Sequence, residues 1–74
     1  MYWKSKPNLI NKVESHRKSC GLTQVALAQK AEVTRQTIIS LEKGDYVPSV
    51  ALAIKIAEAL NTNVESLFIL KENS

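Results

Sequence analysis

The sequence has few residues of several types, and each shortage excludes a kind of protein. Cys20 is the only cysteine among 74 residues, so the chain can build neither a disulfide scaffold nor a cysteine zinc cluster. Its place at the end of an expected helix indicates a small buried hydrophobe. Two glycines, two prolines and 45% hydrophobic residues favour a compact, mostly helical domain over a disordered or β-rich chain.

Long apolar runs and a strong charge of one sign are also missing. The first twenty residues contain no stretch suited to a signal sequence or a membrane span, which predicts a cytoplasmic protein. A net charge of +3 permits binding to a polyanion without requiring it. With one histidine, one cysteine and no paired carboxylates, the sequence predicts no metal site, no cofactor and no catalysis.

Helical periodicity, capping residues and breakers predict five helices in a single domain, residues 1–74. The first helix is expected over residues 8–20, with an inner stripe of Leu9, Ile10, Val13, Arg17 and Cys20. Thr23, Thr34 and Ser49 are candidate N-caps for a second helix up to Ala31, a third over 35–43 and a fourth up to Leu60. The fourth helix is expected to bury Val50, Ala53, Ile54, Ala57 and Leu60, and residues 64–67 form one more turn.

The second and third helices are separated by residues 31–33 alone, so they must cross at a steep angle. That is the helix-turn-helix geometry, in which the second helix of the pair is presented outward. Ala28, Ile38 and Leu41 supply the small and apolar side chains that the crossing needs. Glu32 stands at the bend, where a non-glycine residue with a positive backbone angle costs about 1 kcal/mol.

The segment GLTQVALAQKAEVTRQTIISLEKGDYVPS, followed by LAIKIAEAL and VESLF, resembles the phage-repressor-like Xre/Cro family of transcriptional regulators over residues 8–68. The resemblance implies an all-α, five-helix, lambda-repressor-like domain. It also implies that the third helix enters the DNA major groove, usually in a two-fold symmetric dimer on a palindromic operator. Residues 1–7 are then an N-terminal arm, and residues 68–74 an apolar and then polar tail.

The resemblance also implies roles for single residues. The base contacts would be Arg35, Gln36 and Ser40, whose side chains suit guanine, adenine and either base, respectively. The phosphate contacts would be Gln24, Thr34, Thr37, Lys43 and Tyr46. Gln24 would in addition brace the first contact residue of the third helix.

Arg17 is a charged residue on the apolar stripe of the first helix, and Glu42 lies at the end of the third helix. The two are expected to form a partly buried salt bridge, a pairing that the family commonly has. A phosphate contact is the alternative role for Arg17. His16 is expected at the surface or at the boundary between surface and core.

The leading hypothesis is a sequence-specific double-stranded DNA-binding regulator, a repressor that acts by occupying its operator. The alternative is a protein-interaction module, such as the antitoxin half of a toxin–antitoxin pair. A membrane-surface peptide is disfavoured because the basic residues are spread over several helices. The sequence leaves open the operator, the regulated genes, the sign of regulation and any inducer.

A homodimer would place two copies of the third helix about 34 Å apart, one turn of DNA. The candidate interface residues are Phe68, Ile69, Leu70 and Trp3. Tyr2 and Trp3 either pack back onto the apolar C-terminal segment or reach DNA or a partner subunit. Val25 and Ile39 point outward, as thymine-methyl contacts, interface residues or exposed side chains.

Overall fold

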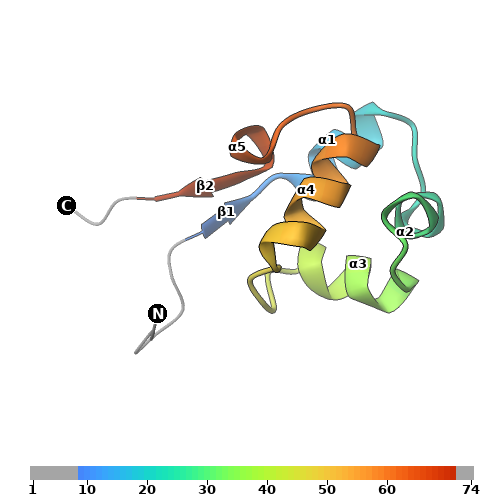
Figure 1. Ribbon diagram of the computed structural model, residues 1–74, viewed down its shortest axis with the longest axis horizontal. Helices are drawn as coiled ribbons and strands as arrows, with labels where there is room; N and C mark the ends of the chain where they lie inside the picture. The colour runs from blue at the N-terminus through green and yellow to red at the C-terminus, as the bar shows by residue number, and fades with distance from the viewer. Residues whose placement is uncertain (1–8, 72–74) are drawn as a thin grey trace.

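The computed structural model describes residues 9–71, and it confirms a mostly helical domain with five helices (Figure 1). The elements in chain order are β1 (Leu9–Asn11), α1 (Val13–Ser19), α2 (Gln24–Ala31), α3 (Arg35–Glu42), α4 (Val50–Ala59), α5 (Val64–Leu67) and β2 (Phe68–Leu70). The two strands form an antiparallel pair that extends from one side of the helical bundle (Figure 1).

The prediction of a helix from residue 8 is wrong at its N-terminal end. Residues 9–11 instead pair with residues 68–70, with Leu9 opposite Leu70 and Asn11 opposite Phe68. Asn11 ends the strand because its side-chain oxygen accepts from Val13 N at 2.9 Å, while its amide donates to the Leu41 carbonyl at 2.6 Å. The expected all-α domain therefore also contains a two-stranded sheet. Residues 68–70 of the apolar tail form one of its strands and pack within the same domain.

The helix starts follow the capping residues that the sequence offered. Thr23, Thr34 and Ser49 each accept a hydrogen bond from the backbone N–H three residues later, as predicted. Asn63 does the same for α5. Each such cap contributes about 1 kcal/mol by satisfying a donor that the helix itself leaves free.

The core lies between the helices and joins α1, α2, α3, α4 and α5. Its buried members are Val13, Leu27, Ala28, Ala31, Ile38, Leu41, Ile56, Ala57, Leu60 and Leu67. Three predictions about burial are wrong. Ile10, which was expected on the inner stripe of the first helix, lies in β1 and is 40% exposed. Cys20 is exposed, because it caps the C-terminus of α1 and the chain turns away at Gly21, where φ is +72°.

The third correction concerns α4. Val50 and Ile54, which were expected to face inward, have exposed fractions of 76% and 44%. Because α4 packs mainly against α2, its buried stripe is centred on Ala53, Ile56 and Ala57, and this rotates Val50 and Ile54 outward. In the part of the chain that the structure describes, no helix has the length and apolar character to span a bilayer.

Candidate nucleic-acid interface

The turn between α2 and α3 is a left-handed bend at Glu32, whose φ is 60° and ψ is 42°. The predicted positive backbone angle is thus confirmed. The bend is held from within, because the N–H of Glu32 donates to Gln29 O at 3.2 Å and that of Val33 to Ala28 O at 3.0 Å. On the surface, Lys55 Nζ lies 3.1 Å from a Glu32 carboxylate oxygen. These bonds fix the angle at which α3 leaves α2.

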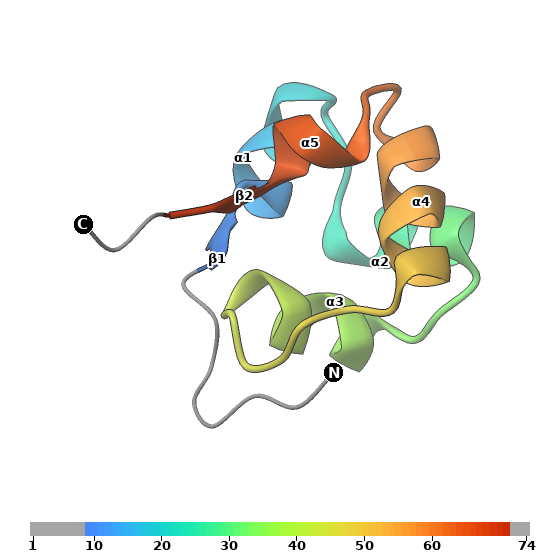
Figure 2. The same ribbon diagram turned by 60° about the vertical axis from the view of Figure 1, so that its left-hand side comes forward.

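The α3 helix has one buried and one open side. Ile38 and Leu41 are fully buried against the core, as predicted. Arg35 and Gln36 are exposed in the first turn, and Ser40 is half-buried one turn later. Both ribbon views show α3 along the outer edge of the domain, with the following loop beside it (Figures 1 and 2). The polar first turn is therefore available to a partner.

The hydroxyl groups at the start of α3 bond to one another. Thr34 Oγ1 accepts from Thr37 N at 3.2 Å and lies 3.0 Å from Thr37 Oγ1. One turn along, Gln36 Nε2 donates to Ser40 Oγ at 3.3 Å. The candidates at the start of α3 thus form two bonded pairs, Thr34 with Thr37 and Gln36 with Ser40.

The loop after α3 begins at Gly44, whose φ of +78° confirms the predicted left-handed end. Asp45 N donates to the Ser40 carbonyl at 3.1 Å, and Tyr46 OH donates to the Thr37 carbonyl at 3.5 Å. Burial raises the pKa of the Tyr46 phenol above its usual value. Because both bonds end on α3, the loop is tied to the helix before it, next to the exposed Lys43 at the C-cap of α3.

The predicted salt bridge between Arg17 and Glu42 is confirmed. Arg17 Nε lies 2.6 Å from one Glu42 carboxylate oxygen, and the side chains are 8% and 4% exposed. A second guanidinium nitrogen donates to the Leu22 carbonyl at 2.8 Å. The hydrogen bond to Glu42 raises the pKa of Arg17, against the opposing effect of burial.

Gln24 joins this cluster from the start of α2. Its Nε2 donates to Glu42 Oε1 at 3.2 Å, so its amide contacts the C-terminal end of α3. Gln24 was expected to brace Arg35, the first contact residue, but Arg35 lies at the opposite end of α3. Sequence reasoning missed this partner because the two residues are 18 positions apart and the contact exists only once the helices have crossed.

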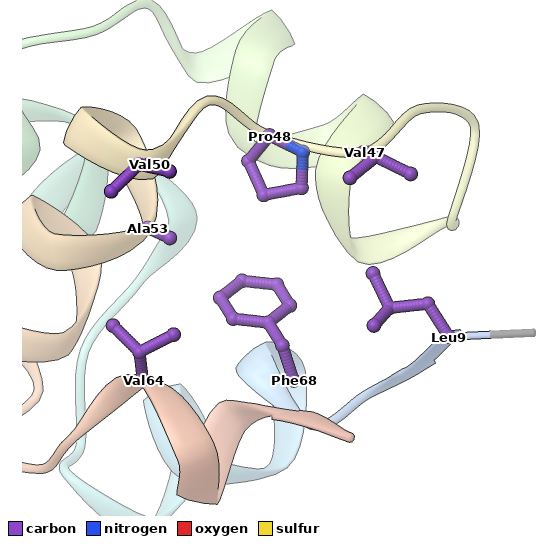
Figure 3. A pocket seen from close by; sticks show the side chains of 7 residues that line it. All are labelled: Leu9, Val47, Pro48, Val50, Ala53, Val64 and Phe68. Carbon is purple, nitrogen blue, oxygen red and sulfur yellow. The ribbon is translucent and has the colours of Figure 1, made fainter. Parts of the chain in front are cut away.

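An apolar groove lies between the loop after α3, the start of α4, α5 and β1 (Figure 3). It has a volume of about 190 Å³, and the described residues that line it are Leu9, Val47, Pro48, Val50, Ala53, Val64 and Phe68. The Phe68 ring stands at its centre and points toward Pro48 (Figure 3). Sequence reasoning named Phe68 but missed the groove, because Leu9 was expected on a helix and Val50 in the core.

Other candidates have less definite places. Val25 is 47% exposed and Ile39 is half-buried. His16 is half-buried, which agrees with a place at the boundary between surface and core, and its Nδ1 lies 3.0 Å from the Lys12 carbonyl oxygen. Tyr2 and Trp3 lie outside the described residues. Among residues 9–71, no three His, Cys, Asp or Glu side chains are grouped to hold a metal ion.

A steeply crossed helix pair with its second helix exposed defines a helix-turn-helix domain. Residues 13–67 match the family profile HTH_3, described as Helix-turn-helix. A Methanothermobacter thermautotrophicus protein named as an uncharacterized HTH-type transcriptional regulator is 55% identical over 62 residues, 82% of this chain and 90% of its own length. YgzD of Bacillus subtilis, also named as an uncharacterized HTH-type transcriptional regulator, is 45% identical over 64 residues, 86% of this chain and 97% of its own. The chain belongs to this family of helix-turn-helix transcriptional regulators, which implies DNA binding.

Proposed function

We propose that the protein is a cytoplasmic, sequence-specific double-stranded DNA-binding repressor that acts by occupying its operator with α3 in the major groove. The observation that carries this proposal is the form of α3. Its Ile38 and Leu41 are fully buried, while the polar Arg35 and Gln36 are exposed in the first turn. In helix-turn-helix proteins, this N-terminal end of the second helix contacts base edges in the DNA major groove. Because Ile38 and Leu41 anchor α3 in the core, the exposed side chains of the helix are presented in a fixed register.

Arg35, Gln36 and Ser40 are the base-reading candidates. Arginine can bond to guanine O6 and N7, glutamine to adenine N6 and N7, and serine to either base. Each good bidentate pair discriminates between bases by roughly 1–3 kcal/mol. A cation in the first turn of a helix is mildly unfavourable for the helix itself, which supports a functional reason for Arg35.

The phosphate contacts come from the residues around this reading surface. Thr34 and Lys43 cap the two ends of α3, and Thr37 lies in its first turn. Tyr46 bonds to the Thr37 carbonyl and Gln24 to the Glu42 carboxylate. Gln24 can still take part, because an amide nitrogen carries two N–H groups and Glu42 uses one of them. Such contacts set register and affinity without reading sequence.

A homodimer on a palindromic operator is the second element of the proposal. The groove of about 190 Å³ is smaller than the roughly 300–1,000 Å³ of small-molecule sites, which favours a protein surface as its occupant. All the described residues that line it are uncharged, so two domains of net charge +3 can meet there without opposing like charges. A standard interface of about 800 Å² per partner would cover about 15% of the 5244 Å² surface.

The groove adjoins the predicted interface residues. Phe68 lines it, Ile69 is half-buried in β2 and Leu70 is 67% exposed, while Trp3 lies outside the described residues. Val50, which is 76% exposed at the rim, could enter the groove of a second copy, as an isologous contact requires. Val50→Asp should therefore give a monomer in light scattering, whereas Ile54→Asp, on the same helix but outside the groove, should leave the dimer intact.

The same apolar groove supports one alternative, a protein-interaction module such as an antitoxin. The double variant Arg35→Ala/Gln36→Ala separates the two functions. It should abolish operator recognition, and it should leave intact any binding of a protein partner through the apolar surface.

The test of the proposal is selection of bound duplexes from a random DNA pool at physiological salt, with the native protein and Arg35→Ala in parallel. Enrichment of a two-fold symmetric motif that loses one preferred base in the variant is the expected result. If the native protein enriches no motif, the DNA-reading function is refuted and the interaction module takes its place.

A further inference from the structure

We propose that Ser40 is a positioning residue that makes Gln36 a reader of adenine, an inference that rests on the proposed function. The two residues lie one turn apart on α3, Gln36 exposed and Ser40 half-buried. Gln36 Nε2 donates to Ser40 Oγ at 3.3 Å. The bond ties the tip of an exposed side chain to a residue that is partly enclosed by the domain.

Ser40 is itself held in place by the loop that follows α3. Its carbonyl oxygen accepts from Asp45 N at 3.1 Å, and Tyr46 OH donates to the neighbouring Thr37 carbonyl. The backbone of Ser40 is therefore held by both the helix and the following loop. Its hydroxyl group can then hold the longer Gln36 side chain in one orientation.

The chemistry of the amide explains why this orientation matters. A glutamine side chain has one oxygen acceptor and two N–H donors. In the major groove, adenine offers one donor and one acceptor, whereas guanine offers two acceptors. When one N–H of Gln36 is given to Ser40, one oxygen and one N–H remain, and these match adenine. Opposite guanine, the Gln36 oxygen would face O6 with no hydrogen between them.

A free glutamine discriminates less well. The terminal torsion of its side chain is broad and roughly two-fold, so the amide can turn either its oxygen or its nitrogen toward a base. Ordering a rotamer-rich side chain on binding also opposes association. The bond to Ser40 removes both disadvantages before DNA is bound. In this inference Ser40 acts through Gln36, and this role replaces the direct base contact named for Ser40 under the proposed function.

Four proteins test the inference: the native chain, Gln36→Ala, Ser40→Ala and Ser40→Thr, which keeps the hydroxyl. The first measurement is the NMR spectrum of the two Gln36 side-chain amide protons in free protein. In the native chain and Ser40→Thr, one proton should be shifted and slowed in exchange relative to the same proton of a glutamine in an unfolded peptide. In Ser40→Ala both protons should return to the unfolded-peptide values.

The second measurement is duplex selection with the same four proteins. The native chain and Ser40→Thr should prefer adenine over guanine at one position of each half-site by roughly tenfold, the order expected from one bidentate pair. Gln36→Ala should lose this preference entirely. Ser40→Ala should lower the adenine-to-guanine ratio severalfold at that position alone, with the guanine preference assigned to Arg35 unchanged.

Three results would overturn the inference, and they differ in what else they affect. If Ser40→Ala keeps the native ratio, Ser40 does not position Gln36. If it changes the preference at another position instead, Ser40 reads a base itself. If the native protein enriches no motif, the assignment of adenine fails together with the proposed function. The amide spectra then show whether the Gln36–Ser40 bond is nevertheless present in the free protein.

Discussion

Replacing Arg17 by methionine should destabilise the domain by about 3–5 kcal/mol, because it leaves the carboxylate of Glu42 buried without its cation. The side chains of the pair are 8% and 4% exposed, so water cannot replace the lost partner. A domain of 74 residues has a total stability of about 4–11 kcal/mol. At about 4–8 °C per kcal/mol, a loss of 3 kcal/mol would lower Tm by about 12–24 °C.

Two further variants show whether the buried charge is the cause. Arg17→Met/Glu42→Leu removes both charges and should recover most of the loss, leaving about 1–2 kcal/mol because the Leu22 carbonyl still lacks its donor. Lys18→Met breaks the exposed pair with Glu14, at 3.1 Å, and should change stability by less than about 0.5 kcal/mol. Urea unfolding followed by circular dichroism measures all three. The reasoning is refuted if Arg17→Met costs no more than Lys18→Met, or if the double variant is less stable than Arg17→Met.

Three other predictions concern the turn, the loop and the DNA contacts. Glu32→Gly should raise the free energy of unfolding, measured by urea unfolding, by up to about 1 kcal/mol, because φ at this position is +60° and glycine adopts that angle without strain. A loss of stability would contradict the strain argument. The pKa of Tyr46 is raised in the folded state, so its contribution is complete below its usual value of 10.0 and is lost as pH rises further. Alkaline titration by ultraviolet absorbance should show, in the native chain, a tyrosine that ionises above its usual pKa and that Tyr46→Phe lacks. A dimer that neutralises about four or five phosphates per subunit should give a log–log salt slope near −7 to −9, and Lys43→Ala should make it shallower by about 2, whereas an unchanged slope would remove Lys43 from the phosphate contacts.

The helices and the turn between α2 and α3 could be predicted because their signals are local. Thr23, Thr34 and Ser49 each act within three residues of their own position, so a short stretch of sequence already contains both bonding partners. The Arg17–Glu42 pair is the exception among distant contacts. It could be predicted because a charge on an apolar stripe needs a partner, and because the family that the sequence resembles commonly pairs these two positions.

The strand pair and the groove could not be predicted for the opposite reason. Leu9 has the same apolar character on a helical stripe as on a strand, and its partner Leu70 is 61 residues away. The exposure of Val50 likewise depends on which neighbour α4 packs against, which the spacing of its apolar residues leaves undecided. Within the site, the identity of the exposed residues of α3 could be predicted, but the bonds of Gln24 to Glu42 and of Gln36 to Ser40 depend on side-chain orientation.

The register of the two strands also determines how the domain responds to mechanical force. Because Leu9 lies opposite Leu70, tension applied at both ends of the described chain pulls on one end of the strand pair. The hydrogen bonds then break one after another, as in a zipper, instead of sharing the load as they would if the strands were sheared. A single-molecule pulling experiment should therefore separate β1 from β2 at low force, before the helices separate. Leu9 on β1 and Phe68 on β2, which both line the groove, would then move apart.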